Sequence, residues 1–229
     1  MAILPTSGRT ALAIAVMAQP LHLAWGTGDI LWDSDQTGGQ FVFTTDLITL
    51  PTNGATVSAV FVSSGGTLYV LGNDYTVTAD GVISRLPGGT IAPGATVTID
   101  YYLGRPAENM DAVALLAEIG RRTVTLKQYV VPAVDGAIVL PEGRFDVSPT
   151  PTHQIHVLFN FDYSDAPAAI IRELAVVLGT VVKDTVPPGQ VYFLPTDIDS
   201  PGYLLALQNI APITRSAAVR QSFEFVLTL

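Results

Sequence analysis

Apolar and polar residues alternate almost perfectly in two segments near the end of the chain, 155–161 and 219–229. Successive side chains of a β-strand point to opposite faces of its sheet, so a period of two predicts strands with one face on a core and excludes an amphipathic helix. In the last segment we expect Phe223 and Phe225 to be buried, whereas Glu224 between them faces solvent.

Short runs rich in Val, Ile, Thr and aromatic residues predict further strands, separated by turn signals such as Asn53-Gly54. The segment 170–178 is ambiguous, because Asp165 followed by Pro167 resembles a helix start, but its β-branched residues favour a strand. We assign it as a strand. The other predicted strands are 40–44, 55–62, 67–71, 75–78, 95–103, 123–131, 137–140, 190–194 and 203–208.

Two short helices complete the expected secondary structure. The apolar segment 9–18 is followed by Pro20, which cannot continue a helix. We expect it to pack as a short helix rather than to serve as an export signal, because its basic region is too weak for a signal peptide. A second helix is expected from Asn109 or Asp111, either of which can cap it, through Glu118.

Turn density changes at two places along the chain, which predicts two structural parts. Turns follow one another closely within 38–104, a pattern typical of a small immunoglobulin-like β-sandwich. The N-terminal segment has too little apolar surface to form a core of its own, so we expect 1–37 to pack on 105–229. We therefore predict a mainly β protein, in which a β-rich body of 1–37 and 105–229 carries 38–104 as an inserted module.

The composition indicates a protein that assembles with others. Only 14% of the residues are charged while 48% are hydrophobic, against roughly 25% charged residues in an ordinary soluble domain. No apolar run approaches the roughly 20 residues that a membrane-spanning helix needs. The 11 basic and 20 acidic residues give a net charge of −9, which disfavours nucleic acid and anionic membranes as partners. We therefore expect other proteins as partners, and a homo-oligomer.

Candidate metal ligands are few, since the chain has no cysteine and three histidines. His153 and His156 would enter one strand at an odd spacing, which points their rings to opposite faces and argues against a shared metal. The loop from Asp33 to Asp35 resembles the opening of a calcium loop but lacks the glutamate of the twelfth position. We expect a solvated linker there, and no metal or cofactor.

No motif for a nucleophile elbow, a phosphate loop or a dinucleotide site is present, so we expect no enzymatic activity. Four aromatic residues leave an alternative open. Their faces could form a stacking platform for sugars, which would make the chain a carbohydrate-binding module or adhesin at the host surface. More often such rings anchor a core or an interface. They are Trp25, Trp32, Tyr101 and Tyr102.

The last 60 residues carry a composite pattern. Ile-Arg-Glu-Leu-Ala-Val at 171–176 precedes Gly-Tyr-Leu-Leu-Ala-Leu at 202–207, then Asn-Ile-Ala-Pro at 209–212 and Phe-Glu-Phe-Val at 223–226. This resembles the N-terminal attachment module of tail-fibre proteins of tailed bacteriophages, although Ala175 replaces the glycine usual in that strand. The segments 22–33 and 114–122 also resemble small proteins associated with contractile-tail baseplates.

The resemblance implies a structural component of the virion tail, assembled in the bacterial cytoplasm from contacts with other tail and baseplate proteins. No elongated shaft follows the pattern, so we expect a baseplate- or tail-attached protein rather than a receptor-binding fibre. Arg172 and Glu173 are neighbours on one strand and should point to opposite faces, one buried and paired, the other exposed or in an interface. Trp25 and Trp32 are the other expected interface residues.

Overall fold

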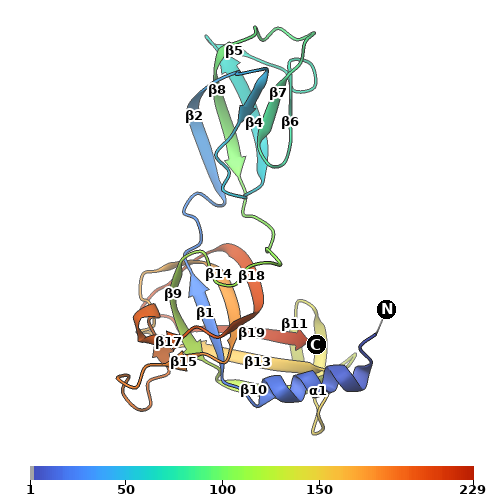
Figure 1. Cartoon of the computed structure of the whole chain (residues 1–229), viewed down its shortest axis with the longest axis vertical. Coiled ribbons are helices and arrows are strands. Elements are labelled where there is room, and N and C mark those ends of the chain that lie inside the picture. Colours follow the sequence, from blue (N-terminus) through green and yellow to red (C-terminus); the bar gives the residue numbers. More distant parts are fainter. Residues whose placement is uncertain (1–2) are drawn as a thin grey trace. The chain divides into compact units, whose positions relative to one another are not determined.

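The computed structural model describes residues 3–229 and divides the chain into two compact units (Figure 1). We call Met1–Gly28 together with Met110–Leu229 the body, and Asp29–Asn109 the inserted unit. Strands dominate both, and the predicted mainly β class is confirmed.

The body contains two five-stranded sheets with antiparallel pairing throughout. The first has the order β16-β9-β1-β14-β18 and the second β11-β12-β10-β13-β19. A small two-stranded sheet, β15 with β17, is added to them. The strands of the first sheet are β1 (Leu21–Gly26), β9 (Glu118–Thr123), β14 (Ile170–Leu178), β16 (Tyr192–Phe193) and β18 (Tyr203–Thr214). Those of the second are β10 (Leu126–Pro132), β11 (Ile138–Leu140), β12 (Gly143–Val147), β13 (Gln154–Phe161) and β19 (Gln221–Thr228). Outside them lie β15 (Val181–Val182), the 3-10 helix η1 (Pro195–Asp197) and β17 (Ile198–Ser200).

One apolar core, the main core, is shared by the two sheets of the body. The alternation predicted for β13 is confirmed, because its four apolar residues of one parity are fully buried. Helix α1 (Thr6–Met17) closes the same core with Ala13 and Val16. It begins three residues earlier than predicted and ends before Pro20. The buried members of the main core from strands are Leu21, Leu23, Trp25, Ile155, Val157, Phe159, Phe161, Ile171, Leu174, Val176 and Leu227.

The closing strand β19 is less buried than its alternation suggested. Phe223 and Phe225 pack against the main core but are only partly buried, so the expectation of full burial is wrong. The reason is the position of the strand, because β19 lies at the end of its sheet and has a neighbour on one side alone. Sequence alternation identifies the apolar face of a strand but not its place in the sheet.

The second predicted helix does not form. Residues 110–117 have no helical structure, and β9 begins at Glu118. This segment crosses the face of the first sheet that points away from the main core, where Leu115 packs on Ala24, Ala175 and Val177. We call these four residues the second cluster. Burial of Leu115 and bonding of the following backbone N–H groups override a local preference for helix.

The inserted unit has its own core between a four-stranded sheet, β2-β8-β4-β5, and a three-stranded sheet, β3-β7-β6. The predicted border at 37/38 falls inside β2, which pairs with β8 on both sides of that point. Trp32 also belongs to this core. The strands are β2 (Ser34–Val42), β3 (Leu47–Thr49), β4 (Val57–Ser64), β5 (Thr67–Leu68), β6 (Tyr75–Val77), β7 (Val82–Arg85) and β8 (Thr96–Leu103).

Candidate assembly surface

Trp25 lies at the centre of the main core rather than on a surface. Its ring stacks on Phe161 with centroids 3.6 Å apart, and its Nε1 donates a hydrogen bond to the Tyr192 hydroxyl at 3.2 Å. The guanidinium of Arg215 lies 5.3 Å from the centre of the indole. Because the side chain is fully buried, it is not available to a partner in this fold and acts as a core anchor.

Trp32 and Tyr101 are likewise buried, both in the core of the inserted unit. Tyr102 is partly buried, with its hydroxyl 3.4 Å from the Asp33 carboxylate. A sugar-stacking platform requires exposed aromatic faces. Three of the four rings considered for such a platform are buried, so these residues do not form one.

Arg172 and Glu173 are both buried, which corrects the expectation that one of them is exposed. Ile171 and Leu174 both contribute to the main core, so two residues instead of one separate consecutive core positions of β14. The pairing of β14 with β18 shifts its register at this point. An irregularity of this kind breaks the alternation on which the expectation rested.

The buried pair joins the two chain segments that lead out of the body and back into it. The Glu173 carboxylate accepts hydrogen bonds from the backbone N–H groups of Leu116 at 3.0 Å and Ala117 at 3.3 Å. Arg172 donates to the carbonyl of Thr27 at 3.3 Å, and the N–H of Thr27 donates to the carbonyl of Ala117 at 2.9 Å. We call this arrangement the junction clamp. Its role is to hold both connections at one place on the body.

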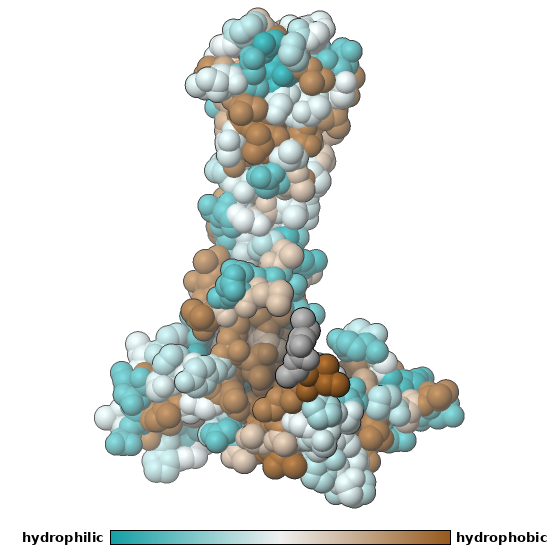
Figure 2. Space-filling model, turned by 45° about the vertical axis from the view of Figure 1, so that its right-hand side comes forward, coloured by the Kyte–Doolittle hydropathy of each residue, from teal (hydrophilic) through white to brown (hydrophobic). Residues whose placement is uncertain are grey.

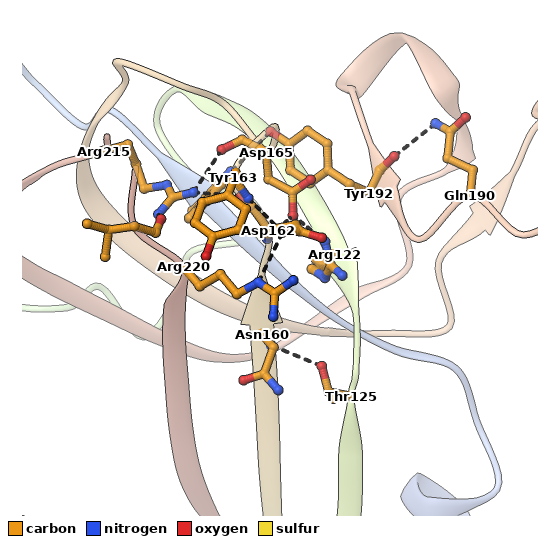
Figure 3. Close-up of polar contacts among 12 residues, drawn as sticks. Arg122, Thr125, Asn160, Asp162, Tyr163, Asp165, Gln190, Tyr192, Arg215 and Arg220 are labelled. Carbon is orange, nitrogen blue, oxygen red and sulfur yellow. Dashed lines mark hydrogen bonds and ion pairs between the residues drawn. The ribbon is translucent and has the colours of Figure 1, made fainter. Parts of the chain in front are cut away.

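Three arginines gather around the loop after β13 (Figure 3). Arg122 forms an ion pair with Asp165, and Arg220 forms one with Asp162 at 3.2 Å. Arg215, which is buried, donates to the backbone carbonyl of Asp162 at 2.8 Å. Sequence reasoning missed this cluster, because its members are up to 98 residues apart (220 minus 122).

A cavity of about 370 Å³ opens beside this cluster, with Arg122, Asn160 and Ser222 in its wall. The pKa of Asp162 lies below its usual range, because the backbone N–H of Tyr163 donates to its carboxylate and Arg220 adds a favourable charge. Both carboxylates at this loop are thus held as partners of arginines. The arrangement fixes the loop and offers hydrogen-bond donors to solvent.

The histidines have structural environments. His156 is buried and bonded on both ring nitrogens, with Nε2 3.0 Å from Glu224 and Nδ1 3.2 Å from Gln128. His22 is buried in β1, with Phe193 packed edge-on at 5.7 Å. Burial, and secondly the positive charge of Arg121, lower the pKa of His22 to about 4. It is therefore neutral near pH 7.

Within residues 3–229, no group of three or more His, Asp or Glu side chains is placed to hold a metal ion. In the loop that resembles the opening of a calcium loop, the Asp33 carboxylate lies 3.5 Å from Arg105. A search of the same residues for a helix of sufficient length and apolar character to cross a membrane found none.

The body has an open edge at the end of each of its two large sheets. Strand β18 ends the first sheet and β19 ends the second, so each has a strand neighbour on one side. Between them lies a pocket of about 160 Å³, whose wall includes Leu174 and Val176 of the main core, Ala206 of β18 and Phe225 of β19. The pocket thus separates the two edge strands and reaches down to buried residues of the main core.

Apolar surface is present on both units, and on the body Figure 2 shows brown surface over the middle of the face turned toward the viewer. Along β18, four consecutive apolar residues are only partly buried. Tyr203 at its start is 79% exposed. Partly exposed apolar side chains beside an unpaired strand edge are features of a protein interaction site. The four residues are Leu204, Leu205, Ala206 and Leu207.

The chain matches the family described as baseplate wedge 3 tail fiber network component over residues 1–50 and 94–229. The match covers most of the chain. The chain belongs to this family. The expectation of a phage tail or baseplate protein is confirmed. A search among curated proteins found no match to the chain.

The match to the baseplate family includes the entire body and has a gap within the inserted unit. Residues 51–93, which the family model leaves out, run from the end of β3 to the turn before β8. The junction clamp and the open edge of β18 and β19 both lie in the matched part.

Proposed function

We propose that this member of the baseplate family is a non-catalytic structural protein, which takes its place in the virion tail through contacts of its body with other tail proteins. It needs no cofactor for this role. Assembly takes place in the cytoplasm of the bacterial host, before the particle is complete.

The observation that carries the proposal is the open edge formed by β18 and β19. A soluble chain that stays alone normally protects such edges with charges or covers them. Here β18 is long and uncharged, and the pocket beside it is lined by the core residues Leu174 and Val176. Burial of apolar surface stabilises an assembly by about 25 cal/mol per Å², so a partner at this edge is favoured.

The inserted unit is not the assembly element in this proposal. It has a core of its own, and the family model leaves out 51–93. Its two connections meet at the junction clamp, where Thr27 and Ala117 are hydrogen-bonded to each other. A short bridge can therefore replace the inserted unit without separating the strands of the body.

The experiment compares incorporation of three variants into phage particles. Replacement of Asp29–Asn109 by a short Gly/Ser bridge should leave incorporation intact. Gln208→Lys, at an exposed position of β18, should exclude a folded protein from particles, because it places a charge on the apolar edge. Thr67→Lys, at an exposed position of the edge strand β5 in the inserted unit, is the matched control.

Incorporation is measured by mass spectrometry of purified particles, and folding by circular dichroism. If deletion of the inserted unit abolishes incorporation while Gln208→Lys is incorporated fully, the assembly contacts lie on the inserted unit and the proposal is wrong. Complete particles with full infectivity in the absence of the protein would refute the structural role itself.

A further inference from the structure

Strand β18 is the longest edge strand of the described chain and carries no charge. Its twelve residues, from Tyr203 to Thr214, include no Lys, Arg, Asp or Glu. The other long edge of the body, β19, carries Glu224. Lysines, other charges and very short length are the usual means by which proteins keep sheet edges from pairing. Over Tyr203–Thr214 the strand has neither charge nor short length, and only Pro212 and two register shifts against β14 interrupt it.

Both faces of β18 carry apolar side chains that an added neighbouring strand could cover. Leu205, Ala206 and Ile210 pack partly against the main core, whereas Leu204 and Leu207 pack partly against the second cluster on the other face of the sheet. All five remain partly exposed. A single added strand would supply neighbours for both faces at once and would pair with the edge of β18 that faces away from β14.

The charge of the chain indicates which strand fits. Two copies of a chain with a net charge of −9 repel each other, so they can approach only where charges are absent. The uncharged β18 meets this condition for itself. Among the edge strands of the body it is also the longest, with twelve residues against eight in β19.

We infer that β18 pairs with β18 of a second copy of this chain, antiparallel and about a twofold axis, so that two five-stranded sheets become one continuous sheet. Isologous pairing of this kind is the common geometry of homodimers. Pro212 limits the ladder, because proline has no N–H to donate. The pairing therefore centres on 203–211. The inference rests on the proposed structural role and names one partner of the open edge.

A single-cysteine scan tests the pairing directly, since the natural chain has no cysteine. Each position from 203 to 210 is replaced in turn in the full chain, and disulfide formation under mild oxidation is measured. In a twofold antiparallel pair, a residue on the axis faces its own copy at about 4.5–5.5 Å. Each step away from the axis separates the two copies by about 6.6 Å along the strand.

Disulfide formation should therefore peak at one position or at two adjacent positions, and fall on both sides. Sedimentation equilibrium of the unmodified chain should show a dimer that dissociates on dilution. Higher salt should strengthen this dimer, because it screens the repulsion between the two negative chains. Thr67→Cys, on the edge strand of the inserted unit, should give no crosslink above background.

Gln208→Lys should raise the dissociation constant of the dimer several-fold, whereas Thr67→Lys should leave it unchanged, with both variants folded by circular dichroism. A monomer at every concentration, a dimer without a crosslinking maximum in β18, or equal crosslinking at all positions would overturn the inference. A monomer that is still incorporated into particles would overturn only the pairing and leave the structural role in place.

Discussion

The carboxylate of Glu173 accepts a hydrogen bond from the backbone N–H of Leu116, which lies 57 residues earlier in the chain, at 3.0 Å. Both groups are held inside the body, and Glu173 is 4% exposed. Through this contact the central strand β14 fixes the segment by which the chain returns from the inserted unit. A pair that looks like an interface motif in the sequence is thus part of an internal joint.

The junction clamp should depend on the charge of Glu173. We expect Glu173→Ala to lower the free energy of unfolding of the body by about 1–3 kcal/mol, because it leaves the backbone N–H groups of Leu116 and Ala117 without their acceptor. Glu173→Gln should lower it less, since one acceptor oxygen remains. Urea unfolding measures both. Glu224→Gln, at a side chain that is 40% exposed, is the control, and an equal loss there would contradict the clamp.

Gly26 should tolerate no side chain. A Cβ at this position would lie 2.7 Å from the Glu173 carboxylate and 2.9 Å from the carbonyl oxygen of Ala117. We expect Gly26→Ala to destabilise the body by about 1–3 kcal/mol, as overpacking does. Gly88→Ala is the matched control, because a Cβ there meets no atom within 4 Å. Equal thermal midpoints of the two variants would show that the junction clamp accommodates a Cβ at position 26 without strain.

The two units should unfold as separate cooperative structures. Each core contains one of the two tryptophans, Trp25 in the body and Trp32 in the inserted unit. Phe159→Ala should therefore shift the fluorescence transition of Trp25 alone, by about 3–5 kcal/mol. Ile99→Ala should shift the transition of Trp32 alone, by about 2–5 kcal/mol.

Single-tryptophan versions, with Trp25→Phe or Trp32→Phe, separate the two signals in chemical denaturation. The two core variants serve as controls for each other. A common shift of both tryptophan signals by one variant would mean that the two cores unfold as one.

His22 should make the body less stable in acid. Its pKa is lowered from 6.5 to about 4 by burial and by Arg121, so the unfolded chain binds a proton more readily than the folded one. Its contribution is present in full above pH 6.5 and is lost as the pH falls from about 6.5 to about 4, by roughly 3 kcal/mol. Below pH 4 this group adds no further loss.

The measurement is the free energy of unfolding of the body between pH 4 and pH 7, followed by Trp25 fluorescence. His22→Phe should flatten the curve relative to the natural chain, since an apolar ring has no proton to gain. His153→Phe should keep the slope. An unchanged slope in His22→Phe would show that other groups cause it.

Alternation along the chain determined the strands and their apolar faces. The period of two in β13 names the four residues that are buried in the main core, and the β-branched residues of 170–178 identify β14 with the bounds that the structure shows. Such patterns depend on neighbours in sequence and on a fixed side-chain period, so they can be read without knowledge of the fold. The short motifs of the last 60 residues likewise suffice to indicate a phage tail protein, and the family match agrees.

Only the tertiary structure decided how exposed each strand is and what its polar residues do. Phe223 and Phe225 are half-buried because β19 ends its sheet, and 110–117 is not helical because it is bonded to Glu173. The loop with Asp162 and Asp165 brings together arginines from two distant segments, Arg122 from one and Arg215 and Arg220 from the other. Sheet order, register shifts and long-range ion pairs arise from contacts between residues far apart in sequence, and local pattern carries no information about which distant segments will meet.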